Sequence, residues 1–131
     1  DPNALQVAVA AAQAVERIGM PEARIILSQA ALYVATAPKS NACYMAIDKA
    51  LDVVKNSKTA PVPVHLQDAH YKGSAKLGHG VGYLYAHDYP NHYVRQQYLP
   101  DAYVNEKFYE PGDMGYERDI KKHLDKIKSE A

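Results

Sequence analysis

Residues 28–51 read SQAALYVATAPKSNACYMAIDKAL, and this stretch decides the fold. Its first part predicts a helix that ends at Ala37, because Pro38 disfavours helical geometry at the residue before it. Its second part carries apolar residues three and four apart, which is typical of one helix face: Tyr44, Ile47, Leu51 and Val54. Ser40 or Asn41 can cap this second helix. Because the link is so short, we expect the two helices to pack as a helical hairpin that the other segments cover.

The residues before this stretch predict a further helix that runs to about Ile18. Asp1 is a good cap, Pro2 suits the first helical position, and Gly19 ends the pattern. The apolar residues of this helix fall on two faces, so we expect it to be buried on two sides. One stripe contains Leu5, Val9 and Ala12, and the other contains Val7, Ala11, Val15 and Ile18.

Residues 65–116 have a different character. They hold five of the six histidines, nine of the eleven tyrosines and six of the seven glycines, with weak apolar periodicity. A helical turn is predicted at Ser74–Leu77, and short extended pieces at 97–99 and 107–109. Tyrosine can cover a core with its ring while its hydroxyl stays in water. We therefore expect this long Tyr-rich segment to be an ordered, irregular wrap across the helices.

The last element is predicted to be an amphipathic helix from about Gly115 to Ser129. Ile120, Leu124 and Ile127 form its apolar stripe, and Asp113 is a plausible cap. Its lysines are best interpreted as a solvated face. The sequence thus predicts an all-α fold for residues 1–131, as one helical domain.

Composition limits the possible functions. Lys plus Arg and Asp plus Glu each number 15, so no overall basic field favours nucleic-acid binding. The single cysteine, Cys43, excludes an internal disulfide and is interpreted as a small core residue. No apolar run is long enough for a membrane span, and no leader precedes the first helix. The start at Asp1 without a methionine suggests a piece of a longer protein.

No motif predicts a catalytic, cofactor-binding or metal-binding residue. The glycines at 78, 80 and 82 lack the Lys-Ser or Lys-Thr of a phosphate loop, so they predict tight turns. The histidine spacings match no metal signature. His87 and Asp88 could pair, but no nucleophile follows a recognisable turn. Basic and aromatic residues do alternate, as at 93–95, which leaves single-stranded nucleic-acid binding open.

Four stretches, in this order, carry a family resemblance: AAQAVERIGMPEARIILSQAALYVATAPKSNACYMAID, VPVHLQDAHY, LGHGVGYLYAHDYP, and QQYLPDAY followed by FYEPGDMGYE. Together they resemble the C-terminal part of the replication-associated recombination protein A family. These are AAA+ ATPases related to clamp-loader subunits, and their eukaryotic relative is the Werner helicase interacting protein. The resemblance implies a collar-like all-α oligomerisation domain that assembles the full protein into a homotetramer.

The resemblance also implies properties of the parent protein. It would be a cytoplasmic, nucleoid-associated ATPase that acts at stalled forks and single-stranded gaps, with DNA and single-strand binding protein as partners and no membrane. ATP and Mg would bind in its ATPase module. The chain has no Walker A, Walker B or arginine finger, so no catalytic residue carries over and this piece is not expected to be an enzyme.

Three functions remain open from the sequence: an oligomerisation domain, a single-stranded nucleic-acid-binding module that uses the Tyr-rich segment, and a small metal- or ligand-dependent enzyme. For the first, we expect aromatic anchors at the oligomer interface, because aromatic residues dominate interface hot spots. Tyr89, Tyr93 and Phe108 are the predicted anchors.

Overall fold

The computed structural model describes residues 1–58 and 60–130, and every regular element within these ranges is helical. The α-helices are α1 (Asn3–Ile18), α2 (Ala23–Thr36), α3 (Ala42–Asn56) and α4 (Gly115–Ser129). Short 3₁₀ helices form η1 (Val64–Leu66), η2 (Ser74–Leu77), η3 (Ala86–Asp88), η4 (Pro90–His92) and η5 (Asp101–Tyr103). The predicted all-α fold is confirmed.

These elements divide into two compact units. The first contains residues 1–41 and 111–121, and so holds α1, α2 and the start of α4. The second contains residues 42–110 and the chain from residue 122 onward. The predicted hairpin across Pro38 would join helices of different units, so it stays a prediction. Within the first unit, the helical hairpin is formed by α1 and α2.

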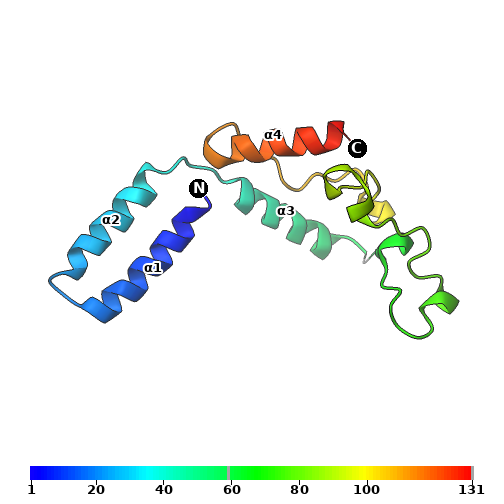
Figure 1. Cartoon of the computed structure of the whole chain (residues 1–131), viewed down its shortest axis with the longest axis horizontal. Helices are drawn as coiled ribbons and strands as arrows, with labels where there is room; N and C mark the ends of the chain where they lie inside the picture. Colours follow the sequence, from blue (N-terminus) through cyan, green and yellow to red (C-terminus); the bar gives the residue numbers. More distant parts are fainter. Residues whose placement is uncertain (59, 131) are drawn as a thin grey trace. The chain divides into compact units, whose positions relative to one another are not determined.

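The α1–α2 hairpin is antiparallel, and its two helices lie side by side (Figure 1). Asp1 caps α1 as predicted, because its carboxylate accepts a hydrogen bond of 2.8 Å from the amide of Asn3. Pro2 already has helical φ and ψ values, which suits a proline at the first helical position. Gly19 ends α1, also as predicted, with a φ of +75° that favours glycine.

The seam between α1 and α2 is lined by residues that recur three and four positions apart, and most of them are alanines. Ala11 and Ala23 are buried, and the other seam residues are half-buried. The small alanine side chains allow the two backbones to approach closely. At the open end of the hairpin, the Tyr33 hydroxyl donates a 2.7 Å hydrogen bond to the Asp1 carboxylate. The seam contains Ala4, Val7, Ala11 and Ala14 of α1, and Ala23, Ile26, Ala30 and Tyr33 of α2.

The first turn of α4 is fastened within the first unit by Glu117. Its carboxylate accepts hydrogen bonds from the Ser40 hydroxyl and from the Gly112 amide, each 2.8 Å long. Gly115 has a φ of +55° and lies so close to Pro38 that an added Cβ would come within 2.9 Å of the proline ring. The predicted cap, Asp113, accepts a 2.6 Å hydrogen bond from Lys121. These contacts hold the 111–121 segment against the end of α2.

In the second unit, Lys49 fixes the segment 106–108 on α3. Its ammonium donates to the Lys107 carbonyl at 2.7 Å and pairs with Glu106 at 3.0 Å. The same ammonium lies 5.7 Å from the centre of the Phe108 ring, within range of a cation–π contact. One side chain of α3 therefore holds three consecutive residues of the loop that precedes α4.

The Tyr-rich segment is irregular, as predicted, and η2 coincides with the turn predicted at Ser74–Leu77. The pieces at 97–99 and 107–109 form no strand. Hydrogen bonds from side chains to main-chain carbonyls fix this segment instead. Tyr98 donates to the Val94 carbonyl, Tyr103 donates to the Lys58 carbonyl, and each bond is 2.7 Å long. The amphipathic helix at the C-terminal end is confirmed by α4, whose predicted stripe, Ile120, Leu124 and Ile127, is half-buried.

Candidate functional site

The described side chains include few buried apolar groups. Ala11, Ala23 and Val94 are the buried ones, whereas many large apolar side chains of α1, α2 and α3 are exposed. The accessible surface is 10345 Å². If the two units were separate compact proteins of the same lengths, together they would expose only about 8,300 Å². The chain therefore presents apolar surface that a self-sufficient domain would bury, and this surface is the first candidate site.

The hairpin carries the first of these surfaces. The prediction that α1 is buried on two sides is wrong for one stripe, because Leu5 and Val9 are exposed. In the other stripe Val7 and Ala11 line the seam, whereas Ile18 is exposed. Leu27 and Val34 of α2 are exposed as well. No charged residue occurs in 3–15 or in 25–37. An uncharged, apolar helix pair is unusual for a surface that remains in water.

The second surface lies on α3. Tyr44, Ile47, Leu51 and Val54, which we expected to be buried, are between 46% and 74% exposed. The half-buried side of α3 is formed instead by Ala46, Ala50 and Val53. This happens because Lys49 directs the adjacent side of α3 toward the 106–108 loop. We call the four exposed residues the α3 stripe.

The interpretation of Cys43 as a core residue is wrong, since its side chain is exposed. Cys43 lies in the first turn of α3, on a different side of the helix from the half-buried Ala42 and Ala46. Its apolar character and helical position suggested burial, but these signals do not report which side of a helix is covered.

The predicted interface anchors all belong to the second unit, and nothing in the structure tests their role. Tyr89 is exposed. Tyr93 is half-buried and stacks on Tyr98, with the ring centres 6.3 Å apart and the planes 25° from parallel. Phe108 is half-buried beside the Lys49 ammonium. Tyr93 and Phe108 therefore already make contacts within their own unit, and the three anchors remain predictions.

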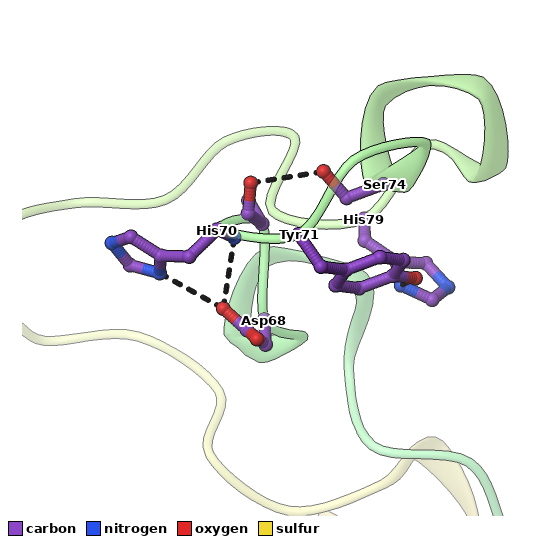
Figure 2. Close-up of polar contacts among 6 residues, drawn as sticks. Asp68, His70, Tyr71, Ser74 and His79 are labelled. Atoms are coloured by element: carbon purple, nitrogen blue, oxygen red, sulfur yellow. Dashed lines mark hydrogen bonds and ion pairs between the residues drawn. The ribbon is translucent and has the colours of Figure 1, made fainter.

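A polar cluster lies in 68–79 of the Tyr-rich segment, and Figure 2 shows its bonds. Asp68 accepts hydrogen bonds from the amide of His70 at 2.9 Å and from its ring Nδ1 at 2.8 Å. The pKa of Asp68 is lowered mainly by the hydrogen bond from the His70 amide, and to a smaller extent by the bond from the His70 ring. The Tyr71 hydroxyl and the Nδ1 of His79 share a 2.6 Å bond, and Ser74 donates to the Ala69 carbonyl at 2.9 Å. These bonds are local and shape the loop.

A run of aromatic rings lies farther along the segment. The His87 ring is 5.0 Å from the Tyr85 ring and 4.8 Å from the His92 ring, measured between ring centres. His87 is therefore placed among rings, and its predicted pairing with Asp88 is not what orients it. Asn91 and His92 both have positive φ values, 54° and 52°. Such backbone strain is characteristic of binding sites, although it does not identify a ligand.

The other motifs give no reaction chemistry. Among the described residues, no three His, Cys, Asp or Glu side chains come together in a way that could hold a metal ion. His65, for example, is bonded to the Gln97 carbonyl at 2.8 Å. Gly78, Gly80 and Gly82 have positive φ values, as predicted for tight turns, and Gly80 is packed against Ala69. Among the described helices, none is long and apolar enough to cross a membrane.

Sequence reasoning missed two features of the structure. It did not single out Glu117, whose bonds to Ser40 and Gly112 close the first unit. A glutamate in the first turn of a helix was the available signal, because such a residue often reaches back to free amides. It also missed the Asp68–His70 pair, for which the spacing of two residues was a weak signal.

Comparisons with known proteins agree with this picture. A family model described as the C-terminal part of the MgsA AAA+ ATPase matches residues 1–128. An uncharacterized AAA domain-containing protein from Mycobacterium tuberculosis is 50% identical over 128 residues, covering 98% of this chain and 28% of the relative. Replication-associated recombination protein A from Bacillus subtilis is 47% identical over 118 residues, covering 89% of this chain and 28% of the relative.

A eukaryotic protein, ATPase WRNIP1 from Dictyostelium discoideum, is 40% identical over 111 residues, covering 84% of this chain and 13% of the relative. The chain thus spans less than a third of the length of these curated relatives. The family model's match spans α1, α2, α3, the Tyr-rich segment and α4 up to residue 128. The all-α fold, the four sequence stretches and these matches together show that the chain belongs to the family of MgsA-type AAA+ ATPase C-terminal domains.

Proposed function

We propose that this chain is a homotetramerisation domain, which assembles a replication- and recombination-associated AAA+ ATPase. The observation that carries the proposal is the exposed apolar surface of the hairpin and of the α3 stripe, in a chain with so few buried apolar side chains. Association of identical chains would bury this surface, since permanent interfaces resemble a domain core cut in half. A formal net charge of zero means that identical copies do not strongly repel one another.

The parent activity is part of this proposal. The relatives' names refer to replication-associated recombination and to ATPases. We propose that the full protein hydrolyses ATP with Mg in a separate module and acts at stalled forks and single-stranded gaps. Its partners there would be DNA and single-strand binding protein, in the cytoplasm at the nucleoid. The described chain would contribute assembly, and catalysis would belong to the ATPase module.

The test is the mass of the 131-residue chain in solution, measured by light scattering over a range of micromolar concentrations. We expect a mass near four times 14.5 kDa without nucleotide or DNA. A chain that stays monomeric as its concentration rises would refute the proposal. A stable dimer would refute tetramerisation by this chain alone.

A second candidate function is single-stranded nucleic-acid binding by the Tyr-rich segment. The observation that favours it is the aromatic run of Tyr85, His87 and His92, because exposed rings can stack on unpaired bases. Fluorescence anisotropy with a labelled single-stranded oligonucleotide tests it at two salt concentrations. We expect affinity to fall steeply with salt and to drop severalfold in His92→Ala. Unchanged affinity in this variant would exclude the aromatic run as the binding site.

A further inference from the structure

We infer that a pocket in the second unit binds a guanidinium group, carried by an arginine side chain of a partner protein. The pocket has a volume of about 480 Å³, which is a usual size for a ligand site. Its described lining comes from two segments that are far apart in the sequence: 60–67, around η1, and 97–102, which runs into η5. Both segments belong to the second unit.

A hydrogen bond of His65 joins the two segments and fixes the hydrogen on its ring. The ring Nε2 lies 2.8 Å from the carbonyl oxygen of Gln97. Because a carbonyl oxygen can only accept, Nε2 carries the hydrogen and donates it. In the neutral ring the other nitrogen, Nδ1, is then an acceptor, and no described residue donates to it. His65 therefore offers the pocket an acceptor.

The two glutamine amides of the pocket are oriented by neighbouring acceptors. Gln97 Nε2 donates to the Leu99 carbonyl at 2.8 Å and to the Asp101 carboxylate at 2.7 Å, which uses both of its hydrogens. Gln67 Nε2 donates one hydrogen to the Val62 carbonyl at 2.7 Å. Since all three partners can only accept, the amide nitrogens must face them, and both amide oxygens stay available as acceptors.

The polar side-chain atoms that remain available in the described lining are therefore mostly acceptors. They are the Oε1 atoms of Gln67 and Gln97, the Nδ1 of His65 and one carboxylate oxygen of Asp101, against a single remaining N–H of Gln67. Asp101 adds a negative charge, and no lysine or arginine occurs among the described lining residues. Such a pocket favours a cation that carries several N–H donors.

The apolar part of the lining favours a guanidinium over an ammonium group. It includes Pro61, Val62, Pro63 and Val64, and the two valines are 53% and 51% exposed. A guanidinium is planar and weakly hydrated, so its face can lie on apolar side chains while the N–H groups at its edge reach the acceptors. A lysine ammonium is compact and strongly hydrated, and it would keep its water.

The extent of the pocket favours a protein as the source of this group. A small free guanidinium compound would leave the apolar part uncovered, whereas the aliphatic stem of an arginine side chain packs on such surface. The Val62 amide has no acceptor among the described residues, so a backbone carbonyl of a partner segment can bond to it. The inferred partner thus presents an exposed arginine on an accessible segment.

The test follows the side-chain amide signals of Gln67 and Gln97 by NMR in the full 131-residue chain. The probes are a short capped glycine–alanine peptide with one central arginine, the same peptide with lysine, and ethylguanidinium chloride. We expect the arginine peptide to bind about tenfold more tightly than the lysine peptide, which corresponds to about one charge-assisted hydrogen bond. It should also bind severalfold more tightly than ethylguanidinium, because its neighbouring residues cover more of the pocket.

Asp101→Asn is the first test variant, because it removes the charge and keeps an oxygen that can accept from Gln97. It should weaken binding of the arginine peptide about tenfold. Asp125→Asn is the matched control: it removes the same charge from an exposed position of α4 that does not line the pocket, and the affinity should not change. Full affinity in Asp101→Asn would overturn the assignment of the pocket.

A second variant tests the pocket without changing charge. Ala102→Leu adds bulk to an exposed lining residue and should abolish binding, whereas Val104→Leu, outside the lining, should not. Unchanged melting temperatures would show that both variants remain folded. Absence of binding by the arginine peptide would overturn the inference, and equal binding of the lysine peptide would overturn the choice of guanidinium. Ethylguanidinium that binds as tightly as the peptide would overturn the protein source and assign the pocket to a free guanidinium compound.

Discussion

Glu117 offers the sharpest test of how the first unit is held together, and Glu117→Ala is the informative change. The carboxylate accepts hydrogen bonds of 2.8 Å from the Ser40 hydroxyl and from the Gly112 amide, and it is half-buried. A hydrogen bond to a charged group contributes roughly 1.5–3 kcal/mol, and less where water competes. We therefore expect the free energy of unfolding to fall by about 2 kcal/mol.

The assay is urea unfolding followed by far-UV circular dichroism, at one fixed chain concentration because assembly shifts apparent stability. Glu110→Ala is the control, since its carboxylate is exposed and lies 3.9 Å from Lys107. This control should change the unfolding free energy by less than about 0.5 kcal/mol.

A double-mutant cycle with Ser40→Ala isolates one of the two bonds. If the bond contributes as the geometry indicates, the coupling energy between the two substitutions should be about 1 kcal/mol. A loss in Glu117→Ala no larger than in Glu110→Ala would refute the view that this carboxylate fastens α4. Additive single effects would refute the direct bond to Ser40 as the source of the loss.

Three further predictions test the backbone, the seam and the polar cluster. Gly115→Ala should destabilise the chain by about 2 kcal/mol in thermal unfolding, because the residue has positive φ and an added Cβ would meet a proline ring. Gly78→Ala, at a residue with positive φ in open space, should cost about 1 kcal/mol. Equal losses in the two variants would contradict the steric contribution at Gly115. Ala23→Leu should cost about 1–3 kcal/mol, because it overpacks a fully buried position of the seam. Ala35→Leu, on the exposed side of α2, should be nearly neutral. Similar melting temperatures for the two variants would contradict close packing of α1 on α2 at Ala23. The pKa of Asp68 is lowered from 3.8, so its bonds to His70 stabilise the folded state above about pH 3.8 and lose that effect as pH falls through the folded pKa. An NMR titration of the carboxylate should show a midpoint below 3.8. A midpoint at or above 3.8 would contradict the hydrogen bonds of the polar cluster.

The sequence by itself determined where the helices begin and end. Asp1 and Gly19 bound α1, and η2 coincides with the turn predicted at 74–77. These predictions hold because caps, glycine conformations and proline restrictions act between residues a few positions apart. The family was also determined at this level, since the four characteristic stretches stand in the sequence itself.

Only the tertiary structure decided which faces are covered. The spacing of Tyr44, Ile47, Leu51 and Val54 states that a helix has an apolar face, but it does not state whether the same chain covers it. Burial depends on which distant segment arrives, and Lys49 brings residues 106–108 to a different side of α3. The bond between Ser40 and Glu117 likewise joins residues 77 positions apart. Pairings over such distances depend on the whole fold, and no local pattern in the sequence encodes them.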